Sequence, residues 1–141
     1  MTEPVSADSS VILKLTLAEP GSVEARQLLD RWAADERPLV APSLLAYEVT
    51  SALRMATYRE RITAGQAETA LEAFWDLQIE LLQTPDLHRR ALELAVALGL
   101  PVAYDAHYLA VAEAHGCEFW TADERLFSAV RPAFPLVRLL A

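Results

Sequence analysis

The sequence predicts an α/β domain in which a short, mainly parallel central sheet is flanked by helices on both faces. Short apolar, strand-like runs alternate with helical patterns along the chain, as is typical of strands joined by helical crossovers. The length of 141 residues suits one domain with its own core. No repeat or flexible linker interrupts the chain, which holds only 4 glycines. We therefore predict a single domain over residues 1–141.

The predicted strands are short apolar runs bounded by turn or helix signals. They cover residues 5–7, 38–41, 79–82, 118–121 and 136–139. The first is weak because it is brief and follows Pro4. In a parallel sheet the ligand site usually lies beyond the carboxyl ends of the strands. The residues that directly follow each strand are therefore the first candidates for a site.

The predicted helices show apolar residues spaced three and four apart. They cover residues 9–17, 22–34, 44–58 with a continuation to 61, 63–77, 86 to a stop at 99–101, 104–115 and 124–130. Ser43 is predicted to cap the third helix. Thr63 and Gln66 form a predicted capping box at the fourth.

The amino-acid composition excludes some classes of protein and favours others. The net charge of −8 argues against a general nucleic-acid coat protein, which needs a basic surface, but it does not exclude an enzyme that recruits cations. Hydrophobic residues make up 53% of the chain, yet no run approaches the ~20 residues that span a bilayer. No secretory signal pattern opens the chain. We expect a cytoplasmic protein without a membrane segment that self-associates or binds a partner. Cys117, the single cysteine, is expected to be a small core residue.

Four acidic residues occupy places that suggest a shared cleft. Asp8 and Asp123 directly follow predicted strands. Glu48 shares its helix face with residues three and four away, which are largely apolar, and Asp105 does the same on the sixth helix. Carboxylates are rarely buried unless they are paired or bind a metal. We expect the four side chains to meet in one cleft.

Each acid also has an ordinary structural explanation. Asp8 and Asp123 precede helices and could serve as N-caps. Glu48 or Asp105 could form a buried salt bridge, and an acid in the first turn of a helix, such as Asp105, is favoured by the helix dipole. The convergence of all four favours the cleft. Two carboxylates about 4 Å apart repel by roughly 4 kcal/mol at an effective dielectric near 20. Such a cluster needs protons, a basic side chain or divalent cations, and its hard oxygen ligands suit Mg²⁺ or Mn²⁺.

Four segments containing these acids resemble the PIN-domain nucleases, and among them the VapC toxins of VapBC toxin–antitoxin modules. The segments are DSSVIL (8–13), PSLLAYEV with the following AL (42–53), YDAHYLAVAE (104–113) and FWTADERL (119–126). The resemblance extends from about Pro4 to the C-terminus. It implies a PIN-like three-layer α/β/α fold, a homodimer, and Mg²⁺- or Mn²⁺-dependent cleavage of RNA that leaves 5′-phosphate and 3′-hydroxyl ends. It also implies a cognate VapB-type antitoxin that covers or fills the cleft.

The resemblance assigns roles to individual residues. Asp8, Glu48, Asp105 and Asp123 become the metal-binding and catalytic acids. Ser10 and Thr121 become supporting hydroxyls beside the first and last acid. From the sequence itself, basic residues that follow the first two acid blocks could contact RNA phosphates, or could simply be solvated. They are Lys14, Arg54, Arg59 and Arg61.

Three interpretations of function remain open. The first is a metal-dependent endoribonuclease toxin restrained by an antitoxin. The second is a housekeeping RNA-processing nuclease without an inhibitor. The third is an interaction module whose acids bind a basic peptide and carry out no chemistry. The histidines His88, His107 and His115 are expected to be surface or core residues, because no further ligands accompany them.

Overall fold

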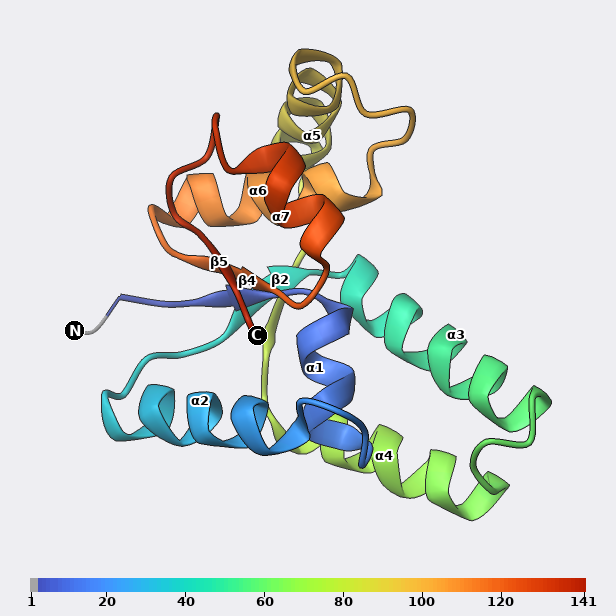
Figure 1. Cartoon of the computed structure of the whole chain (residues 1–141). Coiled ribbons are helices and arrows are strands. Elements are labelled where there is room, and N and C mark those ends of the chain that lie inside the picture. The colour runs from blue at the N-terminus through green and yellow to red at the C-terminus, as the bar shows by residue number, and fades with distance from the viewer. Residues whose placement is uncertain (1–2) are drawn as a thin grey trace.

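The computed structural model describes residues 3–141, so the first two residues of the predicted domain lie outside the description (Figure 1). The strands are β1 (Ser6–Ala7), β2 (Val40–Pro42), β3 (Glu80–Leu82), β4 (Phe119–Thr121) and β5 (Val137–Leu139). The helices are α1 (Ser9–Thr16), α2 (Ser22–Ala34), α3 (Leu44–Tyr58), α4 (Ala64–Asp76), α5 (Pro85–Ala97), α6 (Tyr104–His115) and α7 (Glu124–Val130). Every predicted strand and helix is present in the predicted order.

All paired strands run parallel, as the alternating pattern predicts. One sheet has the order β1-β4-β5 and the other pairs β2 with β3. An isolated parallel bridge between Val5 and Leu39 joins the two sheets, and Val40 N–H donates to the carbonyl of Val5 at 3.0 Å. The carboxyl ends of β1, β2 and β4 therefore face the same edge of the molecule.

Helices cover both faces of the strands. Figure 1 shows α1, α2 and α4 on one side, α5, α6 and α7 on the other, and the hairpin of α3 and α4 projecting past the sheet. The main core lies between these layers and includes fully buried Ile12, Leu45, Tyr108 and Phe119. This arrangement confirms the predicted three-layer α/β/α fold.

Helices α5 and α6 pack through a seam of small side chains. Its members are the buried alanines Ala91, Ala95, Ala106 and Ala110. Small side chains let two helices approach closely, so the first turns of α5 and α6 are held at a fixed separation.

Cys117 is buried at 1% exposure, as expected for a core residue.

Some predicted helix ends need correction. Ser43 occupies the N-cap position of α3, but its side chain forms no capping hydrogen bond, because its backbone is already helical. Its N–H donates to the carbonyl of Leu82 in β3. Helix α3 ends at Tyr58 and does not continue to Arg61, since Glu60 turns the chain with a φ of 57°.

Two further caps are clear. Helix α5 begins at Pro85, one residue before the predicted start, with Thr84 as its cap. The predicted capping box of Thr63 and Gln66 is confirmed at α4. Within residues 3–141, no helix has the length and apolar character needed to cross a membrane.

Candidate active site

Asp8 lies at the carboxyl end of β1 and is only 6% exposed. Its Oδ1 accepts hydrogen bonds from the backbone N–H of Ser10 at 3.0 Å and of Val11 at 3.4 Å, so Asp8 is also the N-cap of α1. The capping explanation is thus correct, and it is compatible with a role in a site. The cap fixes the carboxylate where β1 meets α1.

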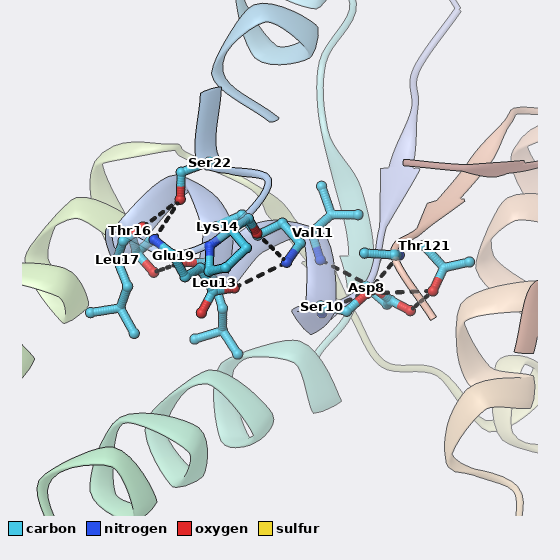
Figure 2. A network of polar contacts seen from close by, with 12 residues as sticks. Asp8, Ser10, Val11, Leu13, Lys14, Thr16, Leu17, Glu19, Ser22 and Thr121 are labelled. Atoms are coloured by element: carbon cyan, nitrogen blue, oxygen red, sulfur yellow. Dashed lines mark hydrogen bonds and ion pairs between the residues drawn. The ribbon is translucent and has the colours of Figure 1, made fainter. Parts of the chain in front are cut away.

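Two hydroxyl groups connect Asp8 to the end of β4 (Figure 2). Ser10 Oγ donates to Asp8 Oδ1 and accepts from the N–H of Ala122 at 2.8 Å. Thr121 Oγ1 donates to Asp8 Oδ2 at 2.6 Å and accepts from the N–H of Asp123 at 3.1 Å. Each hydroxyl therefore donates its one proton to the carboxylate and accepts a backbone N–H with its oxygen. The two contacts together hold the β1–α1 and β4–α7 junctions in register, and we call them the hydroxyl bridge.

Asp123 follows β4 and caps α7. Its Oδ1 accepts from the N–H of Arg125 at 2.9 Å and of Leu126 at 3.2 Å, and the residue is exposed. No hydrogen bond to its other oxygen, Oδ2, is found within residues 3–141. That oxygen stays available to a ligand.

Glu48 is half-buried on the second turn of α3, in agreement with its predicted inward face. It accepts a hydrogen bond from the phenol of Tyr108, which is fully buried on α6. Burial and the neighbouring carboxylates raise the pKa of Tyr108, so the phenol keeps its proton and remains a donor. Tyr108 therefore holds Glu48 in a fixed orientation.

Asp105 is half-buried in the first turn of α6. No hydrogen bond or ion pair to its side chain is found among residues 3–141. Burial raises its pKa first, and the charge of Asp123 raises it further.

Mutual repulsion links all four acids. Burial is the main cause of the raised pKa of Asp8 and of Glu48. The pKa of Glu48 is raised further by the charges of Asp105 and Asp8. Since Asp105 in turn responds to Asp123, a continuous chain of repulsion runs through the cluster. The four acids thus lie within electrostatic range of their neighbours in the cluster, without converging on a single point.

The donor chemistry of the cluster fits a hard divalent cation. Within the described chain, none of the four acids forms a salt bridge with a lysine, arginine or histidine. Carboxylates that are partly buried, repelling and unpaired are expected to recruit positive charge. As placed, no group of three or more acidic, histidine or cysteine side chains within residues 3–141 lies close enough together to hold a metal ion. The cluster therefore offers oxygen ligands without a preformed cage.

The predicted basic contacts lie apart from the acids. Lys14 Nζ, at the far end of α1, contacts Glu19 at 3.3 Å and the carbonyl of Pro20 at 2.9 Å (Figure 2). Arg54 stacks on Tyr58, 5.4 Å from the ring centre. Arg59 and Arg61 border a hollow of about 1090 Å³ between α1, α3 and α4. The structure does not bring these residues to the carboxylates, and their contact with RNA stays a prediction.

The pairing of His88 with His107 was not predicted. Nδ1 of His88 lies 2.9 Å from Nε2 of His107. The two lie on α5 and α6, and neither helix alone shows a pairing pattern. The Tyr108 contact with Glu48 was equally hidden, because the two residues stand 60 positions apart. Tyr108 lies three residues after Asp105, on the same face of α6, but this spacing does not identify its partner on α3.

Comparison with known proteins agrees with this architecture. The family model of the PIN domain matches residues 6–131. The chain therefore belongs to the PIN-domain family, and its fold is that of this class of α/β proteins.

Its curated relatives within that family carry the name VapC. The chain is 35% identical to Ribonuclease VapC9 of Mycobacterium tuberculosis over 113 residues, which are 80% of this chain and 83% of that protein. A crystal structure from Pyrobaculum aerophilum superposes with a TM-score of 0.65 at 26% identity, covering 90% of this chain and 79% of that one. A chain described as a toxin–antitoxin complex from Klebsiella pneumoniae superposes with a TM-score of 0.66 at 20% identity, covering 97% and 98%, and shows the shared fold.

Proposed function

We propose that the chain is a Mg²⁺- or Mn²⁺-dependent endoribonuclease that hydrolyses RNA phosphodiester bonds. The observation that carries the proposal is the run of four repelling acids, without basic partners in residues 3–141, at the carboxyl edge of the parallel strands. The proposal is supported by the ribonuclease name of a relative that is 35% identical over most of the chain.

In the proposed mechanism, the residues of the chain hold the cation and keep its carboxylate ligands in a fixed orientation. Asp8, Glu48, Asp105 and Asp123 would hold the cation, whose charge supplies phosphate orientation, activation of water and stabilisation of the leaving oxygen. The hydroxyl bridge of Ser10 and Thr121 fixes Asp8 against the end of β4. Tyr108 fixes Glu48 from the buried side. RNA binding at so acidic a surface requires the cation, since carboxylates alone would repel the phosphates.

We further propose that the enzyme is the toxin component of a type II toxin–antitoxin system in the cytoplasm, with a VapB-type antitoxin as partner and a homodimer as its working form. The VapC names of the relatives and the description of the Klebsiella pneumoniae neighbour support this assignment. Large apolar side chains exposed on α5, Leu92 at 63% and Val96 at 75%, agree with a covered subunit surface.

Asp105→Asn is the cleanest test of the enzyme, because Asp105 makes no hydrogen bond in the described structure that the change would break. Cleavage of RNA by the purified wild type should require Mg²⁺ or Mn²⁺ and stop with EDTA. The variant should lose at least about 10-fold in rate, since removal even of a group that only supports a metal site typically costs about 10–100-fold. Asp86→Asn is the matched control, since Asp86 is also the second residue of its helix but is 90% exposed and lies on α5.

Three outcomes would contradict the proposal. Cleavage that persists in EDTA would show that the reaction needs no metal. An equal loss of cleavage rate in Asp105→Asn and Asp86→Asn would show a general defect that is not specific to the site. Binding of a basic peptide, together with no cleavage of RNA in the presence of any divalent metal, would favour the interpretation of the chain as an interaction module. Mapping of RNA ends after induced expression, wild type against Asp105→Asn, would then identify the target and the 5′-phosphate and 3′-hydroxyl ends that the proposal requires.

A further inference from the structure

A small pocket of about 220 Å³ is lined in part by sequence neighbours of Glu48 and Asp105. We call it the tyrosine–histidine pocket. The residues that matter for its chemistry are Tyr47, His88, Tyr104 and His107, and apolar side chains such as Leu44 and Leu87 complete the lining. The lining as a whole comes from the carboxyl ends of β2 and β3 and from the starts of α3, α5 and α6. The pocket therefore opens at the same edge of the sheet as the four acids.

Two tyrosines join the pocket to the acids. Tyr47 immediately precedes Glu48 on α3, and Tyr104 immediately precedes Asp105 on α6. Their side chains are 74% and 60% exposed, which is unusual for large aromatic groups without a partner. The two tyrosines that line the pocket are therefore direct sequence neighbours of two of the four acids.

The histidine pair gives the pocket a defined polar edge. His107 Nδ1 lies 2.6 Å from the carbonyl of Ala103 and must donate to it. In the neutral ring His107 Nε2 is then an acceptor, so His88 Nδ1 donates across the 2.9 Å contact. The remaining ring nitrogen, Nε2 of His88, is left as an acceptor. The alanine seam between α5 and α6 fixes the distance between the two rings.

We propose that the tyrosine–histidine pocket binds one unstacked nucleobase of the RNA next to the bond that is cut, an inference that rests on the proposed ribonuclease function. Single-stranded RNA is commonly held by stacking splayed bases on aromatic side chains and by hydrogen bonds to base edges. The exposed tyrosines supply stacking faces, and His88 supplies an acceptor for a base N–H. The volume is below the roughly 300 Å³ of a site for a larger ligand and suits a single ring system.

The surroundings favour a nucleotide over an apolar side chain of another protein. The first turns of α3, α5 and α6 all line the pocket, and each of these helices has at least 12 residues. Their amino-terminal ends carry partial positive charge, which attracts the phosphates flanking a bound base. A base in this pocket would lie at the same edge of the sheet as Glu48 and Asp105, where cleavage is proposed.

Binding can be tested without relying on cleavage. AMP, CMP, GMP and UMP, with ribose 5-phosphate as the control that lacks a base, are titrated into the Mg²⁺-containing wild type. The Cε1–H signals of His88 and His107 are followed by NMR, with His115 on the other end of α6 as internal reference. We expect at least one nucleotide to shift the paired signals and ribose 5-phosphate to leave them in place. Equal shifts by ribose 5-phosphate would assign the site to phosphate and overturn the inference.

Two substitutions at one position test stacking during cleavage. Tyr47→Phe keeps the aromatic face, whereas Tyr47→Leu keeps apolar bulk without it. We expect kcat/KM for single-stranded RNA to fall about tenfold or more in Tyr47→Leu, the scale of losing one base–aromatic stack, and to stay near the wild-type value in Tyr47→Phe.

The outcomes separate the pocket from the enzyme. If Tyr47→Leu cuts RNA as well as the wild type does, the nucleobase assignment is wrong while the ribonuclease function stands. If the wild type cuts no RNA yet nucleotides shift the histidine signals, the proposed function fails and the pocket remains. If Tyr47→Leu converts a dimer to a monomer in sedimentation, the surface is an interface between copies and the assignment is overturned.

Discussion

Asp8 is both a helix cap and a member of the acid cluster. As the N-cap of α1 it satisfies backbone donors, and as part of the acid cluster it is an almost buried carboxylate with a raised pKa. The hydrogen bonds from Ser10 and Thr121 lower that pKa but do not offset burial. The cap therefore stabilises the helix while the carboxylate remains costly to ionise.

Thr121→Val tests the hydroxyl bridge. The change removes the donor to Asp8 and leaves the Asp123 N–H without its acceptor, in a residue that is 0% exposed. We expect the free energy of unfolding to drop by about 1–3 kcal/mol, as for other buried groups left unsatisfied. Urea denaturation with an unchanged slope would measure it.

Thr121→Ser is the control because it keeps the hydroxyl and removes only a methyl group, worth about 0.8 kcal/mol. If serine and valine destabilise the protein equally, packing and not hydrogen bonding explains the role of Thr121.

At the residue scale, the sequence was most informative where a side chain follows a strand. Asp8 and Asp123 could be chosen because parallel strands deliver their next residues to one edge. Inward faces identified Glu48 and Asp105, which are half-buried. Tyr108 and the His88–His107 pair could not be chosen, because their partners lie on other helices and depend on packing.

Helix ends in this protein follow local chemistry where a side chain can reach the backbone. The capping box at α4 was visible in the sequence because both of its residues lie within one turn. Ser43 occupies the predicted cap position of α3 but forms no side-chain cap, because its own backbone is already helical and a capping residue is normally extended. The sequence pattern alone does not reveal that backbone conformation.

Thr63→Ala should destabilise the α3–α4 hairpin by about 1 kcal/mol through loss of the cap. Thr69→Ala, at an exposed position within the same helix, is the matched control and should change the free energy of unfolding little, because alanine favours helix. Thermal denaturation of both variants gives the comparison. A larger loss for Thr69→Ala would contradict a capping role.

For the molecule as a whole, the alternating pattern predicted parallel strands and two helical layers. The division of the strands into two sheets joined at Val5 and Leu39 was not predictable. It depends on how strands of two or three residues twist against the layers, and strands so short leave little pattern to interpret.

The raised pKa values of Asp8, Glu48 and Asp105 predict how stability depends on pH. Their protonated forms favour the folded state fully below the ordinary values of 3.8 for aspartate and 4.5 for glutamate. That contribution is lost as the pH rises through the higher folded values. In EDTA, the unfolding free energy of the wild type should therefore fall more steeply with rising pH than that of Asp105→Asn.

Denaturation curves between pH 4 and 7.5 measure this difference, with the variant gaining its advantage only toward neutral pH. Mg²⁺ at about 100 times its Kd should add roughly 2.7 kcal/mol to the wild type and much less to Asp105→Asn. Parallel pH profiles for the two proteins would show that Asp105 is not strained by its neighbours.

The hydroxyl bridge joins two segments that are distant in sequence, since Asp8 and Thr121 stand 113 positions apart. During synthesis, Asp8 therefore cannot receive this hydrogen bond until Thr121 has been translated. A nascent chain that ends before β4 lacks this part of the site and, with it, the arrangement proposed for catalysis.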